Sequence, residues 1–312
     1  MTNNELLQDR LQKIRQIIGK YGEENFYLSF SGGKDSTVLS HLIDMALPEN
    51  RIPRVYANTG IEYRLILEFV EREREREHLW ELVILKPEVP IKPTLETVGY
   101  PFKSKYHSKI LATYQRSGDT ESVNVYMNRK ECRSGKKKFS ERLCPNILKY
   151  QFSEDFNLKV SAKCCDRMKK DPLHKWQKEN NKAYGIVGIM QSEGGERMNA
   201  QCLAFKGNKL KIFQPLAPMT KEWEEWFIET YNVEICEIYR PPYNFVRTGC
   251  KGCPFALKLQ DELDTLERFF PNERKQCEII WKPVYDEYRR LNYRLKDNIQ
   301  LTFDDSWRWN NE

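Results

Sequence analysis

The sequence lacks long apolar runs. No stretch approaches the roughly eighteen apolar residues that a bilayer-spanning helix requires, and the N-terminal segment lacks the apolar core of a secretory signal. Histidine is also scarce, and the four histidines, His41, His78, His107 and His174, form no metal-ligand spacing. We therefore predict a cytoplasmic protein with no membrane partner, in which each histidine is structural or lies at the surface.

The excess of one charge sign is small. Lys and Arg number 51 and Asp and Glu number 45, so the formal net charge is only +6. This charge allows nucleic-acid binding but does not require it. Cysteine, in contrast, is plentiful. Nine cysteines in a reducing compartment indicate metal or redox chemistry, because structural disulfides are rare there.

The strongest motif is residues 29–36, Ser-Phe-Ser-Gly-Gly-Lys-Asp-Ser. It follows a short apolar segment at 26–30 and precedes apolar residues at helical spacing between 38 and 46. Adjacent glycines let the backbone approach an anion closely, and the first N–H groups of the new helix point toward it. The motif therefore predicts a phosphate-binding loop. It is not a Walker A loop, because the four-residue spacer before the Gly-Lys pair is missing.

Strands and helices alternate along the chain. We expect strands at 26–30, 54–58, 81–85 and 183–189. This alternation predicts an α/β fold with an open, mostly parallel sheet and helices on both faces, and it places ligands at the carboxyl ends of the strands. Both the phosphate loop and the segment after residue 57 stand at such ends.

The predicted domain organisation has two parts. Residues 1–255 are expected to form the nucleotide-binding domain, and 256–312 a helical C-terminal extension. A basic insertion at about 100–182 interrupts the first domain and includes Arg129, Lys130 and the lysines at 136–138. Two interpretations of it stay open: a solvated loop with surface lysines, or a surface that guides a nucleic acid through phosphate contacts.

Four cysteines stand out by their spacing. Cys164 and Cys165 are adjacent, and Cys250 and Cys253 form a C-x-x-C pair followed by proline. Four thiolates can hold a tetrahedral zinc ion or a [4Fe-4S] cluster, and spacing alone does not choose between them. Adjacent cysteines point awkwardly toward one small ion, whereas a cluster offers them separate irons. The geometry therefore favours the cluster, with zinc as the alternative.

These motifs resemble those of a known superfamily. The loop at 31–36 resembles the SGGxDS loop of PP-loop ATP pyrophosphatases, which typically cleave ATP between the α- and β-phosphates. Segments at 59–60, 164–173, 188–197, 214–226 and 242–253 resemble, in order, motifs of the PAPS reductase family and of its cluster-containing adenylylsulfate reductases. The resemblance covers residues 25–255. Asn58 departs from the family's aspartate, and Met190 stands where a first arginine is common.

The resemblance implies a site that binds ATP or adenylyl sulfate. Its predicted contact residues are Ser31, Gly32, Gly33, Lys34, Asp35, Ser36, Thr59, Gly60, Gly188 and Arg197. Lys34 and Asp35 are the predicted catalytic residues: Lys34 would offset charge on the leaving oxygens, and Asp35 would hold Mg²⁺ directly or through water. Arg197 is the candidate for a second phosphate clamp.

One family feature is missing. The reductases attack sulfur with a cysteine in a C-terminal Glu-Cys-Gly-Leu-His-like segment, whereas this chain has only Cys277 after Cys253. The tail at 301–309 contains no cysteine. We expect Cys277 to be a buried helix residue, so the chain lacks the mobile thiolate nucleophile that reduction needs.

A PP-loop together with a predicted cluster and no reductase nucleophile favours ATP-dependent adenylation of an acceptor, with release of pyrophosphate and subsequent sulfur transfer. It occurs in Dnd-type DNA phosphorothioation enzymes and in some cluster-dependent tRNA thiolases. The expected partners are a nucleotide, a nucleic acid as one candidate acceptor, and a cysteine desulfurase or another sulfur donor. The alternatives are an assimilatory adenylylsulfate or PAPS reductase and a non-catalytic nucleotide-sensing module. Spacing singles out no sulfur carrier among Cys132, Cys144, Cys202, Cys236 and Cys277, and it leaves the oligomeric state open.

Overall fold

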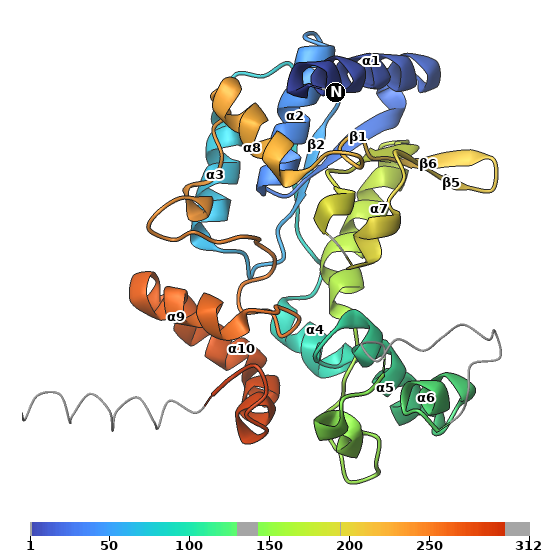
Figure 1. The fold of residues 1–312 in the computed structure, drawn as a ribbon, viewed down its shortest axis with the longest axis vertical. Helices are drawn as coiled ribbons and strands as arrows, with labels where there is room; N and C mark the ends of the chain where they lie inside the picture. Colours follow the sequence, from blue (N-terminus) through green and yellow to red (C-terminus); the bar gives the residue numbers. More distant parts are fainter. Residues whose placement is uncertain (1, 130–142, 194, 297–312) are drawn as a thin grey trace, which may run out of the picture. The chain divides into compact units, whose positions relative to one another are not determined.

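The computed structural model describes residues 2–129, 143–193 and 195–296 (Figure 1). The chain divides into two compact units. Unit 1 comprises Met1–Glu88 and Met168–Gly249, and unit 2 comprises Val89–Arg167 and Cys250–Glu312. In the described ranges, no helix combines the length and the apolar character that a bilayer span needs.

Unit 1 is built on a six-stranded sheet with the order β3-β2-β1-β4-β6-β5. The strands are β1 (Phe26–Phe30), β2 (Arg54–Ala57), β3 (Leu82–Leu85), β4 (Tyr184–Ile186), β5 (Leu203–Lys206) and β6 (Lys209–Phe213). All neighbouring strands run parallel except β5 and β6, which are antiparallel. The predicted α/β fold with a mostly parallel sheet is confirmed. The fourth strand is shorter than expected, ending at Ile186, and the β5–β6 hairpin was not predicted.

The register of the central strands positions the phosphate loop. In β1, Phe26, Leu28 and Phe30 are buried, as expected for a strand with neighbours on both sides. Phe30 pairs with Tyr56 of β2 in parallel register. The residues that follow β1 and β2 therefore leave the sheet at the same edge, as ligand-binding loops of such sheets do.

Helices cover this sheet. Those of unit 1 are α1 (Asn3–Tyr21), α2 (Lys34–Ala46), α3 (Arg64–Glu75), α7 (Asp171–Glu179) and α8 (Lys221–Thr230). Helix α1 begins with a capping box, in which Thr2 and Glu5 each accept a hydrogen bond from the other's backbone N–H. Both α1 and α8 pack against α2 (Figure 1). Two helices thus support the one that begins at the phosphate loop.

Unit 2 is helical. Its helices are α4 (Ile91–Val98), α5 (Lys105–Ser117), α6 (Glu121–Tyr126), α9 (Leu259–Phe269) and α10 (Pro271–Arg290). His107 is fully buried, with Nδ1 2.9 Å from the Tyr126 hydroxyl and Nε2 2.8 Å from the Gln151 amide oxygen. This histidine is structural, as predicted.

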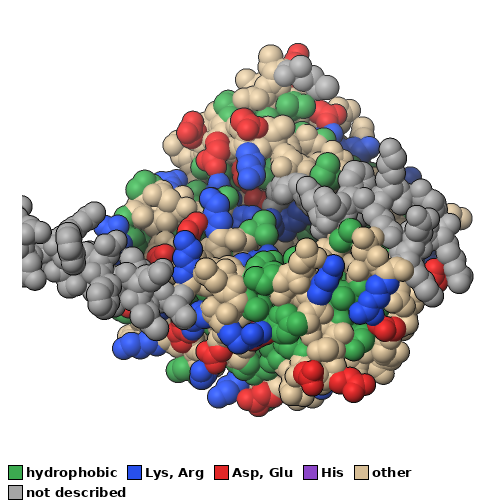
Figure 2. All heavy atoms as spheres, turned by 60° about the horizontal axis from the view of Figure 1, so that its bottom comes forward, with side chains coloured by type: hydrophobic (Ala, Val, Ile, Leu, Met, Phe, Trp, Pro, Cys, Tyr) green, Lys and Arg blue, Asp and Glu red, His purple; other side chains and the backbone are tan. Residues whose placement is uncertain are grey.

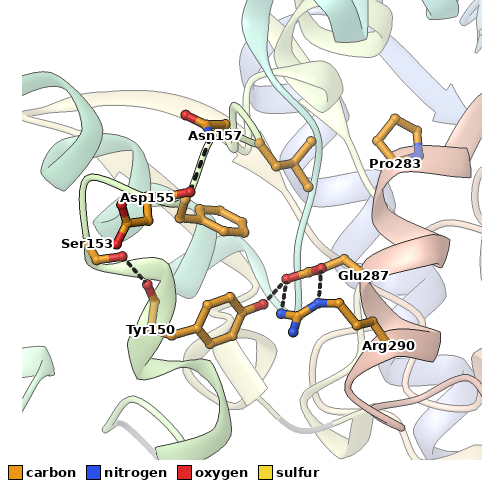
Figure 3. A pocket seen from close by; sticks show the side chains of 9 residues that line it. Tyr150, Ser153, Asp155, Asn157, Pro283, Glu287 and Arg290 are labelled. Atoms are coloured by element: carbon orange, nitrogen blue, oxygen red, sulfur yellow. Dashed lines mark hydrogen bonds and ion pairs between the residues drawn. The ribbon is translucent and has the colours of Figure 1, made fainter.

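A pocket of unit 2 lies between α10 and residues 150–158 (Figure 3). The Tyr150 hydroxyl donates a hydrogen bond to Glu287 of α10, and Glu287 also accepts two hydrogen bonds of 2.8 Å from Arg290. The central part of the insertion is thereby tied to the C-terminal helix.

One basic residue of the insertion forms an ion pair within the insertion. Arg129 pairs with Asp119 at 2.8 Å. On the face that Figure 2 shows, lysines and arginines are interspersed with acidic side chains, and hydrophobic side chains gather between them. Lys130, the lysines at 136–138, Cys132 and the tail from 297 onward lie outside the described residues.

Candidate functional site

The predicted phosphate loop lies between the end of β1 and the start of α2. Gly32 has a φ of 68°, and a Cβ atom there would stand 2.9 Å from a methyl group of Val70 on α3. Glycine is therefore required both for the left-handed turn and for the packing of α3. The next residue, Gly33, is the N-cap of α2. The first N–H groups of that helix form the kind of terminus that binds anions.

Two serines hold the loop in shape. The Ser36 hydroxyl accepts a hydrogen bond from the Ser31 backbone N–H at 3.1 Å and donates one to the Gly33 carbonyl oxygen at 2.9 Å. It also lies 3.0 Å from the Ser31 hydroxyl, which accepts the Gly33 N–H at 3.3 Å. The loop is therefore preorganised by its own side chains.

The Lys34 side chain is paired with an acidic side chain of α8. Its Nζ lies 2.6 Å from Oε1 of Glu225 and 5.8 Å from the centre of the Tyr239 ring. Lys34 keeps about a fifth of its side-chain surface exposed, and Glu225 about half. The lysine charge thus stands at the loop but is balanced by a carboxylate that solvent can reach.

Asp35 shares a hydrogen bond with the buried carboxyl group of Glu224. Burial, followed by the nearby Asp35 charge, raises the pKa of Glu224. Glu224 is only 2% exposed, and its Oε1 has no hydrogen-bond partner within the described part of the chain. Carboxylate oxygens are the ligands that Mg²⁺ prefers, and an orphaned buried oxygen beside Asp35 fits such an ion.

Gly188 touches the phosphate loop. A Cβ atom at this position would lie 2.9 Å from the Asp35 carbonyl oxygen and 3.0 Å from the Asp35 carbonyl carbon. These are backbone atoms that cannot turn away, so only glycine fits here. The structure thereby brings two predicted site segments, 31–36 and the one after β4, into contact.

Thr59 and Gly60 follow β2 at the neighbouring strand end. The buried Thr59 hydroxyl donates a hydrogen bond to Glu62, and Lys169 Nζ lies 3.3 Å from Oε1 of the same glutamate. The Gly60 N–H donates to Oδ1 of Asn58 at 2.9 Å, so the asparagine that departs from the family pattern stabilises this turn.

Arg197 lies in the 3-10 helix Gly195–Asn199, between β4 and β5. Its side chain is half-buried, and its carbonyl oxygen accepts the Ala200 N–H at 2.8 Å. Met190, which replaces a common arginine, is buried. The role of Arg197 as a phosphate clamp stays a prediction.

The four predicted metal-ligating cysteines all belong to unit 2. A hydrogen bond with Cys165, burial, and the neighbouring thiols Cys253 and Cys250 raise the pKa of Cys164. Burial, Cys250 and Cys165 likewise raise the pKa of Cys253. These mutual effects on the pKa indicate that the two pairs, which are far apart in sequence, lie near each other.

The donor set fits the expected metal groups chemically. Four soft thiols suit an iron–sulfur cluster or zinc. Across the described residues, however, no three His, Cys, Asp or Glu side chains are arranged to hold a single metal ion. A [4Fe-4S] cluster takes one thiolate at each of four irons, so it accommodates a wider set of sulfur atoms than one ion does.

A family comparison agrees with these features. The family model for the phosphoadenosine phosphosulfate reductase domain matches residues 25–125 and 121–256, which include the phosphate loop and all four cysteines. The chain belongs to the phosphoadenosine phosphosulfate (PAPS) reductase family. No curated protein sequence gives a significant match to it.

Several solved structures are similar to this chain at low sequence identity. A PAPS reductase from Candida auris, in a phosphate complex, is 11% identical over 80% of this chain and 93% of its own, with a TM-score of 0.46. FMN adenylyltransferase from Candida glabrata, with FAD and inorganic pyrophosphate, is 14% identical over 80% of this chain and 62% of its own, with a TM-score of 0.45. The U34-tRNA thiolase NcsA from Methanococcus maripaludis, with its [4Fe-4S] cluster, is 14% identical over 94% of this chain and 80% of its own, with a TM-score of 0.39.

Beside the predicted nucleotide site, the structure places five residues that the sequence did not single out: Glu62, Glu224, Glu225, Tyr239 and Thr248. The Tyr239 hydroxyl accepts the Lys34 backbone N–H and is hydrogen-bonded to the Thr248 hydroxyl. A phenol thus occupies the first N–H of α2. Tyr239 lies shortly before the family motif at 242–253. This closeness was the only feature of the sequence that pointed to it.

Proposed function

We propose that this PAPS reductase family member binds ATP at residues 31–36 and adenylates an acceptor, with release of pyrophosphate. We further propose that it holds a [4Fe-4S] cluster at the four cysteines of unit 2 and supports sulfur transfer to the adenylated acceptor. A nucleic acid is the favoured acceptor class, and a cysteine desulfurase or another sulfur donor supplies the sulfur.

The burial of Cys277 carries the choice of adenylation over reduction. This side chain is 0% exposed within α10, and burial raises the pKa of its thiol to about 12. A sulfonucleotide reductase needs an accessible thiolate to attack sulfur. The sequence contains no other cysteine after Cys253. Transfer of the adenylyl group needs no cysteine nucleophile.

The loop residues have separate roles in this step. The acceptor oxygen attacks the α-phosphorus of ATP, the bond to the α,β-bridging oxygen breaks, and pyrophosphate leaves. Ser31, Ser36 and the backbone N–H of Gly32 would bind the leaving pyrophosphate, which would also replace the Ser31 hydroxyl as the acceptor of the Gly33 N–H. Lys34 would exchange Glu225 for phosphate oxygens and so offset their charge.

Two bound groups complete the proposal. Asp35 and Glu224 would hold Mg²⁺, which neutralises phosphate charge. Cys164, Cys165, Cys250 and Cys253 would hold the cluster, which supplies one-electron chemistry when bound. In the second half-reaction, hydrosulfide, released from the donor persulfide by a thiol reductant that becomes a disulfide, bonds to the adenylated atom. The bond from that atom to the AMP-bearing oxygen breaks, and AMP leaves with the acceptor oxygen.

Pyrophosphate release from ATP by the anaerobically purified chain tests the proposal, with bulk tRNA and duplex DNA as acceptors. We expect acceptor-dependent release, and we expect Lys34→Ala to reduce it at least a hundredfold. Lys206→Ala is the matched control, since this lysine lies exposed on β5, outside the loop.

Two results would overturn the proposal. One is sulfite production from adenylyl sulfate or PAPS with thioredoxin and no pyrophosphate release from ATP. The other is ATP binding without turnover for either acceptor, which would support the nucleotide-sensing alternative. Iron and sulfide analysis with a visible spectrum tests the cluster separately. Stoichiometric zinc would show that the four cysteines hold a zinc ion and not a cluster.

A further inference from the structure

The loop that carries Cys250 and Cys253 is held by one helix. Three side chains of α10 each donate a hydrogen bond to a carbonyl oxygen of this loop: Trp281 to Lys251, Tyr285 to Gly252, and Tyr288 to Pro254. Successive positions differ by four and three residues, so the donors share one face of the helix. Helix α10 therefore fixes the orientation of the loop's peptide units.

The loop has no room to move toward α10. Gly252 has a φ of 61°, and a Cβ atom there would collide with the Tyr285 hydroxyl and stand 2.8 Å from the Cys277 sulfur. This explains why Cys277 is buried: it packs beneath the turn between the two predicted ligands.

The peptide unit between Pro254 and Phe255 connects the hydrogen bonds that hold the loop to a cysteine sulfur. Its carbonyl oxygen accepts hydrogen bonds from the Tyr288 hydroxyl at 2.9 Å and from Arg294 Nη1 at 2.7 Å. Its N–H, which belongs to Phe255, donates to the sulfur of Cys253. The C=O and N–H of a trans peptide unit point in opposite directions, so donors that fix the oxygen also direct the N–H.

A peptide N–H aimed at a ligand sulfur acts on a cluster bound there. A hydrogen bond to a thiolate stabilises its charged form. Two donors on the carbonyl oxygen polarise the peptide unit and strengthen its N–H as a donor. Hydrogen bonds to ligand sulfurs affect both the affinity and the reduction potential of iron–sulfur clusters.

We propose that Tyr288 and Arg294 are positioning residues, which aim the Phe255 N–H at the sulfur of Cys253 and thereby tune a cluster bound at the four cysteines. This inference rests on the proposed function, because it requires that the cysteines hold a cluster. It assigns a role in metal binding to the C-terminal helical segment, which supplies none of the four ligands.

The test compares Tyr288→Phe with Tyr150→Phe in the full chain after anaerobic cluster reconstitution. Both variants lose one hydroxyl that bonds across unit 2, but the Tyr150 hydroxyl bonds Glu287 and not the cysteine loop (Figure 3). Iron loss to a ferrous chelator and the midpoint potential of the cluster are measured. For Tyr288→Phe we expect roughly tenfold faster iron loss and a lower potential. Tyr150→Phe should match the wild-type chain in both the rate of iron loss and the midpoint potential.

A second variant separates tuning from folding. The Tyr288 hydroxyl also accepts the Lys103 N–H at 2.7 Å, so its removal costs stability as well. Arg294→Gln leaves that contact intact and should shift the potential in the same direction. A wild-type potential and wild-type iron retention in both variants would overturn the inference and leave the proposed function standing. A wild-type chain that takes up no cluster would overturn the cluster assignment and this inference together.

Discussion

Lys34 Nζ lies 2.6 Å from Oε1 of Glu225, so the lysine of the predicted phosphate loop forms an ion pair with a carboxylate. Helix α8 supplies both this carboxylate and the buried Glu224 beside Asp35. Phosphate groups that reach Lys34 must therefore displace Glu225. The ion pair keeps the lysine in place but competes with the ligand.

Replacing the competing carboxylate should tighten nucleotide binding. An ion pair as exposed as this one contributes about 0.2–1 kcal/mol, so Glu225→Gln should lower the Kd for ATP by up to about fivefold. Titration calorimetry measures the effect. Glu229→Gln is the control, because it removes the same charge from an exposed position of α8. Equal changes in the two variants would contradict a specific role for Glu225.

A methyl group at Gly188 should damage the phosphate loop. Its Cβ atom would lie 2.9 Å from the Asp35 carbonyl oxygen, so Gly188→Ala must shift backbone. We expect a loss of about 1–3 kcal/mol in unfolding free energy, together with weaker ATP binding. Gly19→Ala is the contrasting control, since nothing lies within 4 Å of its Cβ position in α1 and alanine favours a helix. Urea unfolding distinguishes the two, and equal stability of both variants would refute the argument.

Acid should destabilise unit 2 through His107. Burial lowers the pKa of this histidine from 6.5 to about 4. Between these values the unfolded chain binds a proton that the folded chain does not, so stability present above pH 6.5 is lost as the pH falls toward 4. The loss between pH 7 and pH 5 should be about 2 kcal/mol. Urea unfolding of His107→Gln should lack this part of the pH dependence, whereas His174→Gln should retain it.

Cys277→Ala should leave the chemistry intact. The side chain is fully buried against the cysteine loop, so its loss creates a small cavity that costs about 1–2 kcal/mol of stability. Pyrophosphate release at a temperature well below the melting point should stay within twofold of the wild-type rate. Loss of turnover in a folded Cys277→Ala chain would revive the reductase alternative.

Local features of the sequence were enough to predict the architecture. The apolar strand at 26–30, the glycine turn and the helical spacing after it are contiguous, and each follows from backbone and burial rules that act within a few residues. The parallel core of the sheet was therefore predictable. The β5–β6 hairpin was missed because its strands are short and partly exposed at the sheet edge, where the apolar pattern is weak.

The surroundings of the loop were not predictable in the same way. Glu62 pairs with Lys169, and Tyr239 caps the N–H of Lys34, so each contact joins residues far apart in sequence. Only the folded sheet brings such side chains together. A single glutamate or tyrosine forms no sequence motif from which its contact could be predicted. The nucleotide contacts and metal ligands themselves stay predictions that the experiments above address.

The two cysteine pairs stand at either end of residues 166–249, the segment that carries β4, β5, β6 and α8. A cluster bound by both pairs would cross-link the chain and close this segment into a loop. Loop closure removes conformations from the unfolded chain, by an amount equivalent to about 4.5 kcal/mol for a disulfide spanning this length. Loss of iron would therefore lower the unfolding free energy of a segment that includes Gly188, Glu224 and Tyr239, without removing any of their contacts.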